Sequence, residues 1–180
     1  MRACGACNLC CKVLQVESLN KPAGQWCVHV LKGRGCGIHG RHPDDCRSFR
    51  CGWLDSPELG PEWKPEISRF VVRDERDQRR ICIDVDPGYP GAWKSPAYYP
   101  LIKQWSRSVR DQSGCVLVYV GDTTIVVFPE EDIELGLLPS GPELVVGYLK
   151  GRGHRRPLVR RMVEGVVVSE WLGTRFATPD

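Results

Sequence analysis

Near its amino end the chain reads Cys4-Gly5-Ala6-Cys7-Asn8-Leu9-Cys10-Cys11, which places four thiols within eight residues. Four more cysteines follow before residue 52, at Cys27, Cys36, Cys46 and Cys51, so this segment holds eight of the ten cysteines of the 180-residue chain. Thiols this dense must be held by disulfides, by zinc or by an iron–sulfur cluster. What holds them decides the fold of the first third of the chain.

The sequence favours a metal over disulfides because it predicts a cytoplasmic protein. Its start, Met1-Arg2-Ala3-Cys4, has no apolar stretch of the kind found in signal peptides, and no run approaches the roughly 20 apolar residues of a membrane span. We therefore expect a location without membrane contact, where thiols stay reduced and disulfides are unusual. A disulfide framework is the alternative if the protein is exported.

Positive charge is concentrated in the cysteine-rich segment. The whole chain has 25 Lys and Arg against 22 Asp and Glu, a net charge of +3. Residues 1–53 have eight basic and three acidic residues, a balance of +5, which leaves −2 for the remainder. Four thiolates around zinc or around an oxidised four-iron cluster carry a net charge of about −2, so nearby cations would stabilise either centre. The basic residues therefore do not require a nucleic-acid partner.

The spacing of the first three cysteines favours an iron–sulfur cluster. Cys4, Cys7 and Cys10 follow one another at Cys-x2-Cys intervals, and three such cysteines with a remote fourth hold the four-iron cubane of bacterial ferredoxins. We expect the fourth ligand to be Cys27, Cys46 or Cys51. Zinc sites more often use two separate Cys-x2-Cys pairs, and this chain has a single run.

Cys11 complicates a single site, because adjacent side chains tend to point apart. Cys10 and Cys11 are therefore easier to place on different metals, or on different irons of one cluster. Eight thiols would satisfy two four-sulfur centres, or one cluster with redox-active spares. Both arrangements stay open.

The ordered cysteine pattern of residues 4–53 resembles the CxxCxxCC family, a zinc- or iron-chelating domain whose members are called YkgJ-family cysteine cluster proteins. The resemblance is carried by the CxxCxxCC run, Trp26-Cys27-Val28-His29, Cys36-Gly37-Ile38 and Pro43-x2-Cys46-Arg47-Ser48-Phe49-Arg50-Cys51. It implies that the metal ligands are the eight cysteines Cys4, Cys7, Cys10, Cys11, Cys27, Cys36, Cys46 and Cys51. Two positions depart from the pattern: His39 stands where the family commonly has tyrosine, and His42 where it usually has arginine.

Three histidines are therefore open as ligands. His29, two residues after Cys27, is more often a loop side chain at such a position. His39 and His42 would either ligate or simply fill the loop. The tryptophans Trp26 and Trp53 are expected to seal the segment against water.

Beyond a proline-rich joint the pattern becomes that of an α+β domain. We predict a metal-binding module of loops and short turns over residues 1–55, packed on a β-hairpin and helix domain over residues 56–180. Strands are expected at 70–72, 81–85, 116–120, 123–128 and 144–149, and helices at 99–110 and 157–164, the second of them closed by Gly165. Residues 166–168 form either a last strand or the tail of that helix. Cys82 and Cys115 fall in strand patterns and are expected to be core thiols.

No motif predicts catalysis: the chain lacks a Gly-x-Ser-x-Gly elbow, a phosphate-binding glycine loop and a His-Glu-x-x-His pair. The leading hypothesis is an iron–sulfur protein, with a [4Fe-4S] cluster in a redox, electron-transfer or accessory role beside a redox or metal-handling partner. The alternatives are a structural zinc module that mediates protein or nucleic-acid interaction, and a carrier of labile zinc or iron. The basic stretch Lys150–Arg161 is expected to form a solvated helix edge or to contact Glu130–Glu134, rather than to bind nucleic-acid phosphate.

Overall fold

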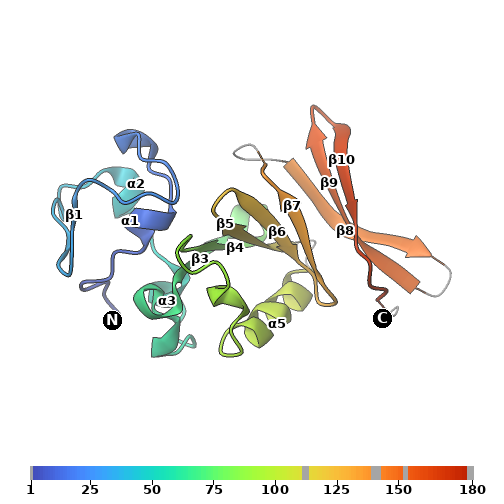
Figure 1. Cartoon of the computed structure of the whole chain (residues 1–180), viewed down its shortest axis with the longest axis horizontal. Helices are drawn as coiled ribbons and strands as arrows, with labels where there is room; N and C mark the ends of the chain where they lie inside the picture. Colours follow the sequence, from blue (N-terminus) through green and yellow to red (C-terminus); the bar gives the residue numbers. More distant parts are fainter. Residues whose placement is uncertain (1, 111–113, 139–142, 152–153, 178–180) are drawn as a thin grey trace. The chain divides into compact units, whose positions relative to one another are not determined.

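The computed structural model describes residues 2–110, 114–138, 143–151 and 154–177 (Figure 1). It contains helices and three sheets, which confirms the predicted α+β class. The chain forms two compact units, of residues 1–74 with 83–98 and of residues 75–82 with 99–180. The module boundary expected at residue 55 stays a prediction. In the described ranges, no helix has the length and apolar character needed to cross a membrane.

The first unit is built from short elements joined by turns. Its helices and 3-10 turns are α1 (Cys10–Val13), η1 (Glu17–Leu19), α2 (Asp44–Arg47), α3 (Gly52–Asp55), η2 (Pro61–Trp63), α4 (Pro65–Ser68) and η4 (Ala92–Lys94). Its strands β1 (Val30–Leu31) and β2 (Gly35–Cys36) form an antiparallel pair. With so little regular structure, this unit depends on side-chain contacts for its stability.

Two apolar clusters stabilise the first unit. Trp63, Phe70 and Tyr98 pack edge to face, with ring centroids 5.0–5.7 Å apart. The second cluster contains Leu9, Val13, Cys51 and Val71 and lies against α1 and α3. This second cluster fixes the one-turn helix that carries Cys10 and Cys11.

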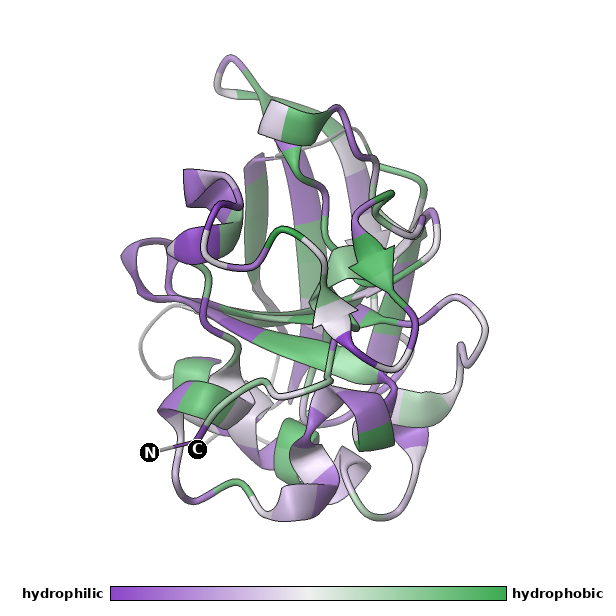
Figure 2. Ribbon diagram, turned by 90° about the vertical axis from the view of Figure 1, so that its left-hand side faces the viewer, coloured by the Kyte–Doolittle hydropathy of each residue, from purple (hydrophilic) through white to green (hydrophobic). Residues whose placement is uncertain are grey.

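A five-stranded sheet has the order β3-β4-β5-β6-β7. Its strands are β3 (Phe70–Glu75), β4 (Arg80–Val85), β5 (Cys115–Val120), β6 (Thr123–Val127) and β7 (Asp132–Gly136), with η3 (Arg76–Gln78) in the first turn. The expected hairpins at 70–85 and 116–128 are confirmed, and Gly121 adopts φ +57° in the second turn. Figure 2 shows hydrophobic residues recurring along the strands, interrupted by hydrophilic ones.

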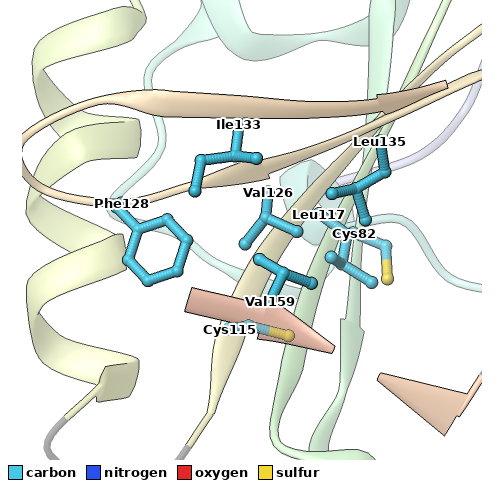
Figure 3. Packing of buried hydrophobic residues seen from close by; sticks show 8 residues of the cluster. All are labelled: Cys82, Cys115, Leu117, Val126, Phe128, Ile133, Leu135 and Val159. Carbon is cyan, nitrogen blue, oxygen red and sulfur yellow. The ribbon is translucent and has the colours of Figure 1, made fainter. Parts of the chain in front are cut away.

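The helix expected at 99–110 is confirmed as α5 (Tyr99–Arg110), which packs on β5 and β6 (Figure 1). A hydrophobic core cluster contains Cys82 and Cys115 together with Leu117, Val126 and Val159 (Figure 3). Cys82 is fully buried and Cys115 nearly so, which confirms their prediction as core thiols.

The prediction of a helix at residues 157–164 is wrong. These residues belong to β9 (His154–Val163), the central strand of an antiparallel sheet with β8 (Glu143–Gly151) and β10 (Val166–Leu172). Glu164 and Gly165 have φ values of 49° and 77°, so they make the hairpin turn between β9 and β10. Gly165, which suggested the end of a helix, thus lies in a two-residue β-turn.

The described residues of the basic stretch Lys150–Arg161 accordingly lie on β8 and β9 and not on a helix edge. Arg160 forms an ion pair with Glu170 of the neighbouring strand, with Nε and Oε2 2.6 Å apart. Arg156 donates to the carbonyl of Gly173 at 2.7 Å. Two of its cations are therefore engaged locally, and Arg152 lies outside the described residues.

Candidate metal centre

One cavity in the first unit has a volume of about 170 Å³ and is lined by all eight amino-terminal cysteines. The rest of its wall is largely apolar and includes Leu14, Ile38, Phe49 and Val71. All ten cysteines of the chain are free thiols. Residues that are up to 47 positions apart in the sequence are thus gathered around one space, as the predicted ligand set requires.

Cys4 and Cys7 are brought together by a tight turn. The N–H of Cys7 donates to the carbonyl of Cys4 at 3.0 Å. Burial raises the pKa of the Cys7 thiol, while hydrogen bonds from the N–H groups of Leu9 and Glu66 act in the opposite direction. N–H groups directed at sulfur are the donors that a thiolate bound to metal needs.

Cys51 is held beside this turn by Arg2. The guanidinium of Arg2 donates to the carbonyls of Trp53 and Ser56 at 2.7 and 2.9 Å and stacks over the Trp53 ring. The start of the chain is therefore tied to the residues that follow Cys51. Cys51 also packs in the apolar cluster that Cys10 contacts.

Charge interactions also relate Cys4, Cys7, Cys10 and Cys51 to one another. Burial raises the pKa of Cys51, and the charges of Cys4 and Cys7 raise it further. The pKa of Cys10 is raised first by its hydrogen bond to Cys11, by burial and by the charge of Cys11, and then by the charges of Cys7 and Cys4. We call Cys4, Cys7, Cys10 and Cys51 the first thiol set.

The remaining four cysteines form the second thiol set, Cys11, Cys27, Cys36 and Cys46. The N–H of Cys27 donates to the carbonyl of Cys11 at 2.9 Å, and Cys36 on β2 pairs with Val30, whose N–H donates to the carbonyl of Cys27. Burial raises the pKa of Cys46, and the charges of Cys11, Cys27 and Cys36 add to this effect. Cys46 thus has the three other members as neighbours.

Cys10 and Cys11 stand where the two sets meet. A hydrogen bond between their thiols raises the pKa of Cys10 and lowers that of Cys11 to about 7. The charge of Lys21 also lowers the pKa of Cys11. Cys11 is therefore the thiol of this pair that ionises first.

Lys21 is a buried cation near the candidate site that the sequence does not reveal. Its ammonium donates to the carbonyl of Lys12 in α1 and to that of Leu14, just after α1. Burial lowers its pKa, whereas the charges of Cys11, Cys27, Cys10 and Cys46 raise it. Lys21 is one of the eight basic residues of the segment 1–53, and nothing in the sequence around it indicates that its side chain is buried.

The three histidines are placed differently. His39 and His42 line the cavity, with ring centroids 5.0 Å apart, whereas His29 is not among the lining residues. The Nδ1 atom of His42 is buried and has no hydrogen-bond partner among the described residues. A buried nitrogen without a partner is costly, and a metal or a thiol placed in the cavity could supply that partner.

The prediction that Trp26 and Trp53 seal the segment against water is correct only for Trp53. Trp53 packs against the apolar cluster of α1 and α3, but Trp26 is 50% exposed, with the ammonium of Lys12 5.4 Å from its ring. Apolar side chains from the segment itself, such as Leu14 and Phe49, cover the thiols instead.

The side chains are not converged on a single point. Within the described ranges, no three His, Cys, Asp or Glu side chains are close enough together to hold one metal ion. The chain matches no family model, and no curated protein or solved structure is significantly similar to it. The resemblance to the CxxCxxCC family therefore stays a prediction that rests on cysteine spacing.

Proposed function

We propose that this chain is a metal-binding protein that holds an iron–sulfur cluster in its amino-terminal unit and serves in electron transfer or as an accessory to redox chemistry. The observation that carries the proposal is the gathering of eight free thiols around one cavity. Coincidental burial would scatter such thiols through the core, as it does Cys82 and Cys115.

The first thiol set fits the cluster best. Cys4, Cys7 and Cys10 have the spacing of a ferredoxin-type run, and Cys51 is the remote cysteine that the Arg2 contacts hold beside them. Of the three candidates for the fourth ligand, Cys51 is therefore preferred over Cys27 and Cys46.

The size of the cavity favours a polyatomic group over one ion. Zinc binds thiolates at about 2.3 Å, so four thiolates around one ion leave no space between them. A cavity of about 170 Å³ among the thiols suits a cluster in which each cysteine binds a different iron. The thiols would have to turn inward on binding, because metal sites are rarely preformed in the empty chain.

The surroundings suit an anionic centre. A hydrogen bond to Asp55 raises the pKa of Arg50 and one to Glu66 raises the pKa of Lys64, and the charge of Cys4 adds to both effects, so both cations lie near Cys4. When bound, a cluster would supply a one-electron redox couple, whose potential depends on nearby charge, N–H donors and exposure to solvent. To the environment of the cluster this chain would contribute the cations Arg50 and Lys64, the N–H groups of Leu9 and Glu66 that donate to the Cys7 sulfur, and the apolar wall of the cavity.

The test is metal and sulfide analysis on protein purified without oxygen. A cluster predicts brown protein, about four iron and four inorganic sulfide per chain, and visible absorption that bleaches with dithionite. Colourless protein that contains zinc, with no iron or sulfide, would refute the cluster and support the zinc module.

Matched cysteine variants test the ligand assignment. Cys7→Ser is expected to abolish iron and visible absorption, because it removes a ligand of the first thiol set. Cys82→Ser replaces a fully buried thiol in the second unit and is expected to leave the iron content unchanged. Equal loss of iron in the two variants would contradict the assignment.

A further inference from the structure

We propose that the outer face of the three-stranded sheet is the interface of a weak two-fold dimer, in which a second copy of this chain covers it. The outer face is the side of β8, β9 and β10 that points away from the core of the second unit (Figure 1). The proposal goes beyond the metal site and does not depend on it, because every residue that carries it belongs to the second unit.

Strand pairing shows which side chains form the outer face. Val146 and Trp171 are both paired with Val159 of the core cluster, and both pack against that cluster. Paired residues of antiparallel strands share a face, and successive residues of a strand alternate between faces. The neighbours of these three residues, and the residues in register with those neighbours, therefore point away from the core. They are Glu143, Val145, Gly147 and Leu149 of β8, Arg156, Leu158, Arg160 and Met162 of β9, and Val167, Glu170 and Leu172 of β10.

Apolar residues recur on both faces of β8 and β10. An antiparallel strand with one face in water normally alternates apolar and polar residues, whereas continuous apolar runs are typical of strands that are covered on both sides. Four apolar residues of the outer face are nevertheless 41–50% exposed in the single chain: Val145, Leu149, Val167 and Leu172. The outer face therefore has the composition of a covered surface, and contact with another chain removes its apolar side chains from water.

The charges of the outer face identify a second copy as the partner. The face carries two acidic and two basic residues, Glu143, Glu170, Arg156 and Arg160. Because these charges balance, a strongly acidic or strongly basic partner gains no net attraction from the face. A second copy does gain it, since Arg160 and Glu170 lie side by side on β9 and β10, with both side chains accessible to solvent.

Two-fold symmetry makes the face complementary to itself. A two-fold axis that runs along the strands, between β9 and β10, stacks β9 of each copy on β10 of the other. It thereby places Arg160 of each copy opposite Glu170 of the other. The same axis places Leu158 opposite Leu172 and Met162 opposite Val167, because these residues are also cross-strand partners. Each charge therefore meets its opposite, and each of these apolar side chains meets an apolar one.

The size of the face predicts a weak dimer. Its strands have 9, 10 and 7 residues. At about 3.3 Å per residue and about 4.8 Å between strands, the face covers roughly 400 Å² per copy. That is about half of the ~800 Å² per partner of a stable interface, so we expect a Kd on the order of 100 µM. At low micromolar concentrations the chain is then a monomer, with Arg160 and Glu170 in contact with solvent.

The experiment is sedimentation velocity of the full chain, purified without oxygen and kept reduced so that no intermolecular disulfide forms. Between about 5 and 500 µM, the mean mass of the wild type is expected to rise from that of the monomer toward that of the dimer. Because this measurement needs no substitution, it does not depend on whether a variant folds. A monomer throughout this range would mean that something other than a second copy covers the face, and would overturn the proposal.

Charge-reversal variants test the pairing across the axis. Arg160→Glu and Glu170→Arg each place like charges opposite one another, and each is expected to weaken self-association by at least about tenfold. An equal mixture of the two variants is expected to associate again, because the acidic side chains of one variant then oppose the arginines of the other. Arg107→Glu reverses an exposed charge on α5, outside the outer face, and is expected to associate like the wild type. If reversal on the outer face has no larger effect than reversal at Arg107, or if the mixture stays monomeric, the proposal fails.

Discussion

Replacement of Lys103 by methionine is expected to destabilise the second unit by about 3 to 5 kcal/mol, the usual cost of removing one partner of a buried ion pair. The Nζ atom of Lys103 lies 2.7 Å from Oδ1 of Asp132, and the two side chains are only 12% and 10% exposed. The same ammonium donates to the carbonyl of Phe128 at 2.5 Å, and the hydroxyl of Tyr99 donates to the other Asp132 oxygen at 2.8 Å. The pair thereby ties α5 to the start of β7.

The magnitude follows from burial rather than from distance. At an effective dielectric constant of about 20, two charges at this separation attract by about 6 kcal/mol. Desolvation offsets much of this attraction in the intact pair, but Lys103→Met leaves the carboxylate of Asp132 desolvated without its cation. For a chain of this length the loss corresponds to a fall in Tm of roughly 6 to 20 °C.

The control is an ion pair of nearly equal length on the surface. Arg160 and Glu170 are 2.6 Å apart but 41% and 40% exposed, so Glu170→Gln should cost at most about 1 kcal/mol. Urea unfolding followed by circular dichroism gives both values. If the two variants differ by less than about 1 kcal/mol, burial does not decide the strength of these pairs, and the reasoning is refuted.

Three further predictions concern the second unit. Leu117→Ala, at a fully buried position, should cost about 2 to 5 kcal/mol in urea unfolding, against less than about 0.5 kcal/mol for Leu137→Ala at a position that is 75% exposed; equal costs would contradict the described core. Burial raises the pKa of Cys115 to about 11, so only about one molecule in a thousand carries its thiolate at pH 8, and mass spectrometry should find it unmodified by iodoacetamide in the folded protein. Burial opposes ionisation of Glu131, but hydrogen bonds from Thr174 and the Arg175 backbone outweigh it and lower the pKa. This contribution to stability is present above the usual glutamate pKa of about 4.3 and is lost as the pH falls through the lower pKa of the folded protein. Glu131→Gln should flatten that part of the curve of stability against pH, and an unchanged curve would show that the hydrogen bonds are not made.

The hairpins and α5 could be predicted because their signals are local. Gly121-Asp122 marks a two-residue turn between apolar runs, and the four-residue recurrence of Leu101, Trp105 and Val109 marks a helix that begins near Tyr99. The strand β9 could not be predicted in this way. A proline followed by a closing glycine fits a short helix as well as a strand with a hairpin turn, and only pairing with β8 and β10 decides between them.

The candidate site shows the same limit. Cysteine spacing predicts that thiols will gather, and the cavity contains all eight of them. Spacing does not predict which cysteine completes the first run, because Cys27, Cys46 and Cys51 are all remote from it. Our proposal of Cys51 rests on the contacts of Arg2 with the carbonyls of Trp53 and Ser56, which no sequence pattern signals.

The adjacent pair Cys10-Cys11 links these two levels. Successive residues of a helical turn project about 100° apart, yet the thiols of Cys10 and Cys11 are hydrogen-bonded to each other. The ammonium of Lys12 further anchors α1 through an ion pair with Asp86, a side chain that is only 5% exposed. Lys21 holds the carbonyls at the end of the same turn. A helix of four residues, held by the ammonium groups of Lys12 and the buried Lys21, thus fixes where the backbone places the two adjacent thiols of the candidate site.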